Sequence, residues 1–269
     1  MDISVVIVSY KSEHLIIKNI EKFNKNTRIF VIENAEDKTL KEQIENKFRN
    51  VKVILNKNRG FGQAANLGAE LAKTKYIFFC SPDNIISNNC FQKLEKIADD
   101  LNDKFSLLVL SNQKDYTDRL KKVEEVEGIS CFLIKKDSFS NISGFDENFF
   151  LYYEDIDLVK RLLNNNNNIY KIPVKYHSEG ASHNKRYNYP LELNRNWHYM
   201  WSKFYYIKKH KGYFFSLILT LPFFLRSIFK MIYNFNNPEK RNIYYARFSG
   251  LLNSYRLKKS WYRPNLKIK

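Results

Sequence analysis

Residues 3–8 of the chain read ISVVIV, and this run decides the fold class. Five of its six side chains are β-branched and apolar, without the alternation expected of a half-exposed strand. Such a run is typical of a strand that is buried on both faces of a parallel sheet. A polar turn at residues 9–13 follows, and then Leu15, Ile16 and Ile20 recur with the spacing of one helix face. The chain therefore opens with a β–α unit.

The same unit is repeated downstream. Strands are predicted at residues 29–32, 51–55 and 76–80, and helices at residues 39–48 and 64–72. This β-α-β-α-β-α-β order predicts an α/β fold, Rossmann-like, with a doubly wound and mostly parallel sheet. Ligands of such sheets gather outside the carboxyl ends of the strands. Those ends carry Ser9, Tyr10, Glu33 and Asp83, which we expect to converge.

The segment GFDENFFLYYEDIDL at residues 144–158 places acids on both sides of an aromatic patch. It follows a predicted helix at residues 94–101 and predicted strands at residues 107–110 and 129–134, and a short strand is predicted at residues 170–172. Its five acids are Asp146, Glu147, Glu154, Asp155 and Asp157. Acids beside apolar walls have shifted pKa values and can transfer protons. Alternatively, Asp155 caps the next helix, with Glu154 and Asp157 favouring its dipole.

The composition limits the class of protein and its partners. A hydrophobic fraction of 44% over 269 residues excludes global disorder. The formal charge of +17, from 45 Lys and Arg against 28 Asp and Glu, implies an anionic partner. The candidates are nucleic acid, an acidic membrane surface and a phosphorylated substrate. Cys80, Cys90 and Cys131 lack pairing or metal-ligand spacing, and no signal peptide precedes the first strand, so we expect a cytoplasmic setting.

The chain changes character near residue 194. We predict a catalytic domain at residues 1–190 and a basic, aromatic, helical region at residues 191–269. Residues 213–225 form an apolar run of 13, which is shorter than the ~20 residues that span a bilayer. Arg226 and Lys230 follow, so an amphipathic helix at an anionic membrane surface is predicted. The alternative is a helical pair that packs on the main domain or on a second subunit as a homodimer.

Four separated patterns occur in one order along the chain. They are residues 5–10 (VVIVSY), residues 58–62 (NRGFG) with Ala64, Asn66 and Gly68, residues 81–83 (SPD), and residues 144–158 with Arg161. Together they resemble the family 2 glycosyltransferases of the GT-A fold, in particular the bacterial rhamnosyltransferase-like branch, over residues 3–182. The resemblance implies transfer of a sugar from a nucleoside diphosphate to an acceptor hydroxyl with inversion at the anomeric carbon.

The resemblance implies the residues that hold the nucleotide. Ser9, Tyr10 and Glu33 would contact the nucleobase and ribose, although the family more often has Asp at the third position and Tyr10 can also be explained by packing. The stretch Asn58, Arg59 and Gly60, with Asn66, would lie near the nucleotide. That stretch lacks the Gly-x-Gly-x-x-Gly and Walker patterns, and a tight turn into a closely packed helix also explains it.

Ser81, Pro82 and Asp83 take the place of the family's Asp-x-Asp metal motif, with Asp83 as its last acid. A single carboxylate is a sparse metal site, which Mg²⁺ tolerates because it keeps several waters and takes phosphate oxygens of the substrate as ligands. The expected cofactor is Mg²⁺ or Mn²⁺. The family often adds a His after the strand that follows the catalytic acid. His177 holds that position, and His183 is the second candidate.

The resemblance makes Asp155 the catalytic base and gives Glu154 an orienting role. Asp146 and Glu147 would fix their loop and contact the acceptor or donor sugar. Arg161 would pair with these acids or contact the diphosphate.

The branch implies dTDP-rhamnose as donor, with UDP-linked sugars left open. It implies a lipid-linked saccharide of a bacterial surface polysaccharide as acceptor, at the cytoplasmic face of the membrane. Three other functions fit the sequence less well. A nucleic-acid surface is opposed by the apolar run and the lack of a known module, and a nucleotidyltransferase by the lack of glycine in residues 9–14. A non-catalytic binding protein is opposed by Asp83 and Asp155.

Overall fold

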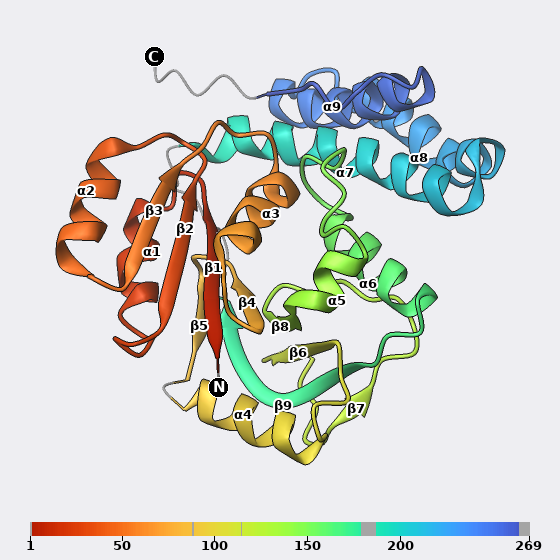
Figure 1. The fold of residues 1–269 in the computed structure, drawn as a ribbon. Helices are drawn as coiled ribbons and strands as arrows, with labels where there is room; N and C mark the ends of the chain where they lie inside the picture. The colour runs from red at the N-terminus through yellow and green to blue at the C-terminus, as the bar shows by residue number, and fades with distance from the viewer. Residues whose placement is uncertain (1, 88, 114, 179–186, 264–269) are drawn as a thin grey trace. The chain divides into compact units, whose positions relative to one another are not determined.

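The run at residues 3–8 lies inside a nine-stranded sheet in the computed structural model, which describes residues 2–87, 89–113, 115–178 and 187–263 (Figure 1). The chain divides into two units. The first contains Met1–Asp146 and Asp155–Asn184, and the second contains Glu147–Glu154 and Lys185–Lys269. The acid-rich segment is therefore shared between the two units.

The amino-terminal half of the first unit has the predicted β–α order. Its four strands pair in parallel in the order β3-β2-β1-β4. The elements are β1 (Ile3–Ser9), α1 (Glu13–Ile20), β2 (Arg28–Glu33), α2 (Lys38–Lys47), β3 (Val51–Leu55), α3 (Phe61–Leu71) and β4 (Tyr76–Cys80). The register sets Ser9 of β1 opposite Glu33 of β2. The predicted convergence of these two strand ends is thus a property of the sheet.

The second half of the sheet is mixed, where the sequence predicted a mostly parallel one. Its elements are β5 (Asn84–Ile86), α4 (Cys90–Asp100), β6 (Leu107–Asn112), β7 (Lys121–Lys122), β8 (Phe132–Lys135), α5 (Lys136–Asn141), α6 (Glu154–Asn164) and β9 (Ile169–Ser178). β8 runs antiparallel between β4 and β6. β9 is parallel to β6 but antiparallel to β5 and β7. The α/β fold class is confirmed, and strand direction is the feature that sequence periodicity did not provide.

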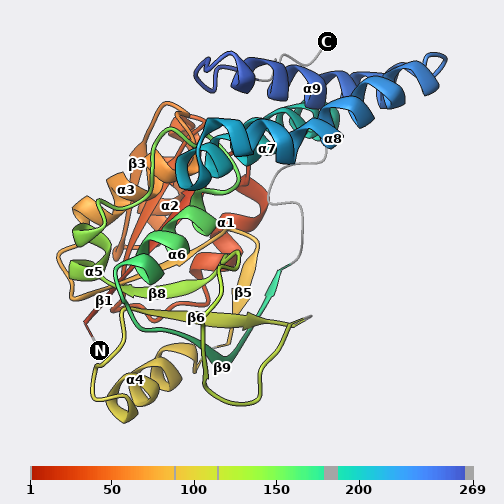
Figure 2. The ribbon, with the colours of Figure 1, turned by 90° about the vertical axis from the view of Figure 1, so that its right-hand side faces the viewer.

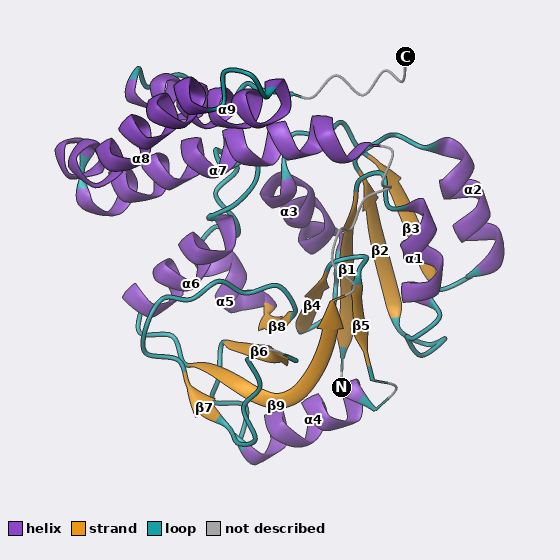
Figure 3. Ribbon diagram, turned by 180° about the vertical axis from the view of Figure 1, so that it is seen from behind, coloured by secondary structure: helices purple, strands orange, loops and turns teal. Residues whose placement is uncertain are grey.

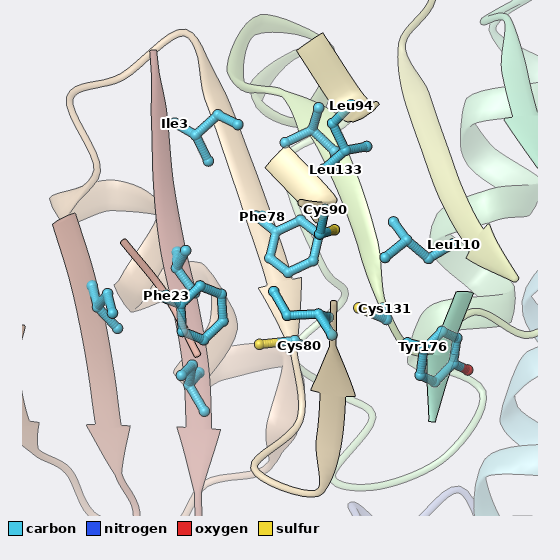
Figure 4. Close-up of a cluster of buried hydrophobic side chains, with 14 of the residues drawn as sticks. Ile3, Phe23, Phe78, Cys80, Cys90, Leu94, Leu110, Cys131, Leu133 and Tyr176 are labelled. Atoms are coloured by element: carbon cyan, nitrogen blue, oxygen red, sulfur yellow. The ribbon is translucent and has the colours of Figure 1, made fainter. Parts of the chain in front are cut away.

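Each face of this sheet has its own hydrophobic core. Along β1, Val5 and Ile7 enter the core shared with α1, α2 and α4, while Val6 enters the core shared with α3, α5 and α6. Figure 3 shows α1 and α2 on one side of the parallel strands and α3 on the other. Figure 4 shows the first core, where Phe23 and Phe78 lie near Cys80, Cys90 and Cys131. This two-sided burial is why the run at residues 3–8 has no polar alternation.

Glycine allows α3 to lie directly on the sheet. A Cβ atom on Gly68 would lie 2.4 Å from Cγ1 of Val6, inside van der Waals contact. The interpretation of the small-residue helix as a close-packing helix is therefore confirmed.

The second unit contains three long helices that lie side by side (Figure 2). They are α7 (Asn188–Lys211), α8 (Tyr213–Tyr233) and α9 (Pro238–Tyr255). α7 and α9 approach closely at Gly250, where a Cβ atom would lie 2.4 Å from the carbonyl oxygen of Trp197. Met200, Phe204 and Leu251 form a further buried cluster between these helices. The predicted helical extension is confirmed.

The apolar run of 13 residues is part of a longer helix. α8 extends over 21 residues, with a mean hydropathy of 1.6 in its most apolar window, and by length and composition it is able to cross a membrane. Arg226 and Lys230 are contained in the helix, so the apolar run of 13 residues was not its boundary. The helix is therefore long enough to span a bilayer, and the prediction that it is too short is wrong.

Candidate active site

The turn after β4 presents Asp83 at the carboxyl end of the parallel strands. The backbone N–H of Asn84 donates to the carbonyl oxygen of Ser81 at 3.0 Å. This bond closes a four-residue turn with Pro82 at its second position, where proline favours the required φ. Ser81 and Pro82 thus have a clear local role, which is to hold Asp83.

A strand pairing encloses the Asp83 carboxylate. Ser178 of β9 lies opposite Asn84 of β5, and its hydroxyl donates to Oδ2 of Asp83 at 2.6 Å. Asp83 is consequently buried, with 9% of its surface exposed. No sequence motif marks Ser178, because its hydrogen bond to Asp83 depends on the register of β5 with β9.

His177 precedes Ser178 and belongs to the other face of β9. Its Nδ1 lies 2.9 Å from Oε1 of Gln113, and its side chain is exposed. Successive strand residues point to opposite faces, so the contact with Asp83 comes from Ser178 and not from His177. His183 lies outside the described residues. In the described ranges, no group of three or more His, Cys, Asp and Glu side chains is placed to hold a metal ion.

Asp155 lies in the first turn of α6 and is fixed by backbone donors. Its Oδ2 accepts the N–H of Ile129 at 2.9 Å, and the nearby N–H groups of Asp155 and Ile156 favour the charged form of the carboxylate. A Cβ atom on Gly128 would lie 3.1 Å from Oδ2, so glycine leaves room for this close approach. The residue as a whole is half-buried, but its carboxyl group is enclosed, and burial raises the pKa of Asp155 despite the three donors. α6 begins one residue earlier, at Glu154, and the role of Asp155 as a base stays a prediction.

The connection before β8 links the two acids. Nδ2 of Asn84 donates to Oγ of Ser130 at 3.1 Å, while Asp155 accepts from the adjacent Ile129. Consecutive Cα atoms are ~3.8 Å apart. The turn that carries Asp83 and the start of α6 therefore both contact one dipeptide. The sequence pattern predicts these two residues as part of a strand, and no motif marks either as part of the site.

The chain enters α6 through two unusual residues of the second unit. Tyr152 and Tyr153 have φ values of 68° and 69°, the left-handed region that non-glycine residues rarely adopt. Each such residue costs roughly 1–2 kcal/mol unless its surroundings hold it. Ring contacts with α7 provide support, since Tyr152 lies 5.8 Å from Tyr199 and Tyr153 lies 5.5 Å from Tyr206 between ring centroids. Nothing in the sequence indicated this conformation, which directly precedes Glu154.

Glu154 begins α6 and is buried, with 7% of its surface exposed. Asp146 is half-buried and Glu147 is exposed, and the two fall in different units. The orienting and sugar-binding roles of these three acids stay predictions.

Arg161 has a structural partner. Its Nε donates to Oδ2 of the fully buried Asp157 at 2.7 Å, and its Nη1 donates to the carbonyl oxygen of Ile142 at 2.5 Å. Of the two roles predicted for Arg161, the structure provides a salt bridge, which ties α6 to the end of α5. Contact with a diphosphate stays a prediction.

Asn66 holds the loop that leads into the acid-rich segment. Its Nδ2 donates to the carbonyl oxygen of Phe145 at 2.9 Å, and its Oδ1 accepts the N–H of Phe145 at 2.8 Å. Gly144 has a φ of 63°, and a Cβ atom there would lie 2.5 Å from Oδ1 of Asn66. The amide is thus used to position a loop 79 residues away, and its predicted nucleotide contact is not tested by these bonds.

Ser9 and Glu33 lie side by side at the ends of β1 and β2 but are buried. Glu33 is 1% exposed, and its Oε1 accepts the N–H of Ala35 at 2.8 Å. Burial raises the pKa of Glu33, and the Ser9 hydroxyl and the Ala35 N–H oppose this shift. Tyr10 is half-buried. Among these predicted nucleotide ligands, Tyr10 has the side chain most open to a ligand.

The loop before α3 forms a tight turn. Gly60 has a φ of 115° and precedes the first residue of α3, and its N–H donates to Oδ1 of Asn58 at 3.2 Å. Arg59 between them is exposed. The structure therefore explains the glycine by conformation and leaves Arg59 free to be tested as a phosphate ligand.

The first unit also contains a cavity of about 480 Å³ away from these residues. Ile3 and Arg28, at the amino ends of β1 and β2, line it together with Thr74. Ligands of doubly wound sheets bind at the opposite, carboxyl ends. We therefore do not assign the active site to this cavity.

The parallel half-sheet, the antiparallel β8 beside β4 and the acid at the start of α6 define the GT-A class of glycosyltransferase. Residues 4–159 match the family model for glycosyl transferase family 2, so the chain belongs to that family. The resemblance inferred from the four sequence patterns is confirmed.

Relatives of known annotation are similar at low identity. The rhamnosyltransferase WbbL of Escherichia coli (strain K12) is 25% identical over 223 residues, which cover 68% of this chain and 84% of the relative. The minor teichoic acid biosynthesis protein GgaB of Bacillus subtilis (strain 168) is 24% identical over 73% of this chain, which spans 25% of that protein. A stretch of 33 residues is 48% identical to the N-acetylglucosaminyl-diphospho-decaprenol L-rhamnosyltransferase of Mycobacterium tuberculosis (strain ATCC 25618 / H37Rv).

Among solved structures, residues 1–349 of S. aureus TarS in complex with UDP-GlcNAc match with a TM-score of 0.57 and 14% identity. The match covers 98% of this chain and 93% of that one. At this identity the likeness shows the fold alone.

Proposed function

We propose that this glycosyltransferase moves L-rhamnose from dTDP-rhamnose to a hydroxyl group of a lipid-linked saccharide, with inversion. The similarity to a rhamnosyltransferase over 84% of its length supports the sugar. The name of the mycobacterial relative contains a diphospho-decaprenol and supports a lipid-linked acceptor, although that match covers 12% of this chain. The observation that carries the proposal is the Asp155 carboxylate, fixed by Ile129 and enclosed enough to have a raised pKa.

Asp155 acts as the general base in this proposal. Its raised pKa makes the carboxylate a stronger proton acceptor than a solvated one, and its backbone donors hold the group in one orientation. The acceptor hydroxyl would lie within 2.6–3.2 Å of the carboxylate, as general-base catalysis requires. As that oxygen attacks the anomeric carbon opposite the diphosphate, Asp155 takes its proton. A single displacement of this kind inverts the configuration.

Asp83 is the residue that would hold Mg²⁺ or Mn²⁺. Its carboxylate is a hard oxygen ligand, which suits both ions, but the described residues supply no cluster of further ligands around it. A metal ion at Asp83 would therefore need oxygen atoms of the nucleotide sugar's diphosphate and of water to complete its coordination shell. The ion, when bound, would neutralise the charge of the departing diphosphate.

The nucleotide would lie at the carboxyl ends of β1 and β2. Ser9 and Glu33 form the buried base of this region, Tyr10 offers a ring at its edge, and exposed Arg59 offers a cation to the phosphates. The enzyme would work at the cytoplasmic face of the cell membrane, where a lipid-linked acceptor is reached. Three free, buried cysteines agree with a reducing compartment.

Glycosyl transfer by the purified full chain tests the proposal. dTDP-rhamnose, UDP-galactose and UDP-N-acetylglucosamine are compared as donors with N-acetylglucosamine linked to a prenyl diphosphate as acceptor. Asp155→Asn should lower the rate by about 10²–10⁴-fold and leave nucleotide-induced thermal shifts nearly unchanged. Asp137→Asn is the matched control, since Asp137 is an exposed acid in the first turn of α5.

Two results would change the proposal. An Asp155→Asn variant that retains more than about a tenth of the rate is inconsistent with a general base at this position. Faster transfer from a UDP-sugar would replace rhamnose as the donor sugar and leave the reaction class intact.

A further inference from the structure

α8 has its polar and apolar faces reversed relative to a helix of a soluble protein. The residues it buries are Ser216, Thr220 and Ser227, all small and polar. Large apolar side chains with 48–72% of their surface exposed form a stripe along the opposite side of the helix. The stripe consists of Phe214, Ile218, Leu221, Leu225, Phe229 and Ile232. Their spacings of three and four residues keep them on one helix face over the full length of α8.

The buried hydroxyl groups explain how a polar face can pack inside the unit. Thr220 Oγ1 donates to the carbonyl oxygen of Ser216 at 2.6 Å and lies 3.0 Å from the hydroxyl of Tyr255 in α9. Ser227 donates to the carbonyl oxygen of Phe223 at 2.8 Å. Each hydroxyl therefore bonds within the helix or to α9. The small side chains let the neighbouring helices approach, and the apolar bulk is left on the outside.

A contiguous apolar stripe of this size requires a partner surface. Soluble proteins rarely expose large continuous apolar patches unless these bind a membrane or another protein. Residues 187–263 contain 14 Lys and Arg against two Glu and no Asp. Burying this stripe against a second copy would bring two strongly basic units together, which is unfavourable. A bilayer with anionic headgroups satisfies both the apolar stripe and the surrounding positive charge.

Within its unit, α8 packs against both α9 and α7. Tyr213 donates to the carbonyl oxygen of Tyr255 at 2.9 Å, and the rings of Phe224 and Phe248 lie 4.9 Å apart, so α9 follows α8 over much of its length. On α7, Nζ of Lys203 lies 3.5 Å from the ring centroid of Phe223.

The helices beside α8 are too polar to accompany it across a membrane. Near the middle of α8, Lys203 of α7 lies over the ring of Phe223, and α9 carries Arg247 directly before Phe248, whose ring contacts Phe224. A spanning α8 would take these charges into hydrocarbon or break away from its partners, and both are costly. A helix that lies in the plane of the surface exposes its stripe to lipid and keeps α7 and α9 in water.

We propose that α8 is an in-plane membrane anchor, whose apolar stripe inserts into one leaflet of a bilayer with anionic headgroups. Arg226, which is exposed, and Lys230, which is half-buried, lie on the same helix and would meet the headgroups. Although its length and hydropathy are sufficient for crossing, α8 does not span the membrane. This inference concerns a surface of the second unit and does not depend on the identity of the donor or acceptor.

Flotation of the full chain with vesicles tests the surface. The vesicles contain phosphatidylcholine alone, or three parts phosphatidylcholine to one part phosphatidylglycerol. The double variant Leu225→Glu, Phe229→Glu should bind both vesicle types about tenfold or more weakly than the unchanged chain. The matched control is Tyr116→Glu, Leu120→Glu, which places the same charges on exposed apolar residues outside α8 and should bind normally. Arg226→Gln, Lys230→Gln should weaken binding only to the anionic vesicles.

The depth of α8 is measured with a fluorophore on introduced cysteines. Burial raises the pKa of all three native thiols and shields them, so single cysteines at Phe214, Leu221 and Ile232 can be labelled selectively. Quenching by lipid-borne spin labels should give one shallow depth at all three positions. A spanning helix would instead place the middle position ~15 Å deeper than the ends.

Three results would overturn the proposal. The first is normal vesicle binding by the stripe variant, and the second is a deep middle position. The third is a chain that forms dimers in solution and loses them, but not vesicle binding, when the stripe is altered. Circular dichroism and thermal unfolding of the variants separate lost binding from lost folding.

Discussion

Replacing Asn66 with Ala removes the bond pair that holds the loop before the acid-rich segment. The N–H and carbonyl groups of Phe145, now bonded at 2.8 and 2.9 Å, both lose their partner. Phe145 is 2% exposed, so water reaches these groups poorly. An unsatisfied buried group costs roughly 1–3 kcal/mol, and about 1.5 kcal/mol for each of the two groups gives a loss of about 3 kcal/mol. For a chain of this size, that loss lowers Tm by about 6–12 °C.

Thermal unfolding, followed by circular dichroism, measures this loss against two further variants. Glu70→Ala changes an exposed residue of the same helix, and we expect an effect within about 0.5 kcal/mol. Asn66→Asp keeps an acceptor for the Phe145 N–H but lacks the donor, so its Tm should lie between those of the other variants. If Asn66→Ala has the same Tm as Glu70→Ala, the two hydrogen bonds do not contribute measurably to stability. If it instead loses nucleotide affinity at unchanged Tm, the predicted nucleotide contact is the correct role.

Three further predictions concern titration and metal binding. Burial raises the pKa of Asp155, and the base works only when it is deprotonated. The value of kcat/KM should therefore rise with pH, with the midpoint of the rise above the ordinary Asp pKa of about 3.9. A midpoint at or below about pH 4 contradicts this. Burial lowers the pKa of His198 to about 3, so between about pH 6.5 and 3 the unfolded chain binds a proton that the native chain does not. Stability should therefore fall as pH falls through that range, by about 1.4 kcal/mol per unit, and urea midpoints of His198→Gln should show a smaller pH dependence. An equal slope in both proteins would refute the assignment. Asp83→Ala should weaken Mn²⁺-dependent nucleotide binding in calorimetric titrations, and unchanged titrations would count against a metal role.

The neutral state assigned to His198 also follows from its bonds. Its Nε2 lies 2.9 Å from the carbonyl oxygen of Tyr262, which can only accept, so Nε2 carries the proton. Its Nδ1 then accepts the hydroxyl of Ser260 at 2.9 Å. Both nitrogens are satisfied without a charge.

Local periodicity was sufficient for the first half of the sheet. Residues 3–8 and 76–80 were predicted as strands because two-sided burial makes their sequences apolar without interruption. β5 and most of β9 were missed, because Lys171, Pro173 and Lys175 interrupt the apolar pattern of β9. The antiparallel direction of β8 depends on how the chain returns to β4, which no short stretch encodes.

The site was found only where its residues form a motif. Asp83 and Asp155 were selected from sequence, but Ser178 and Asn84 were not. Their contacts come from the register of β5 with β9 and from the connection before β8, so they join residues far apart in the chain. Tyr153, with its left-handed φ, has no sequence signal either, since its support comes from rings on α7.

By itself, the sequence determined the α/β class, the family, the two principal acids and the presence of a basic, apolar carboxyl-terminal region. Those properties depend on side-chain type and on spacing along a few neighbouring residues. Tertiary structure alone decided that a serine contacts Asp83, that Asn66 bonds to a distant loop, and that α8 buries its hydroxyl groups and exposes its Phe, Leu and Ile side chains. Hydropathy is the same whichever face of a helix packs inward, so only the positions of α7 and α9 could establish which side of α8 remains exposed.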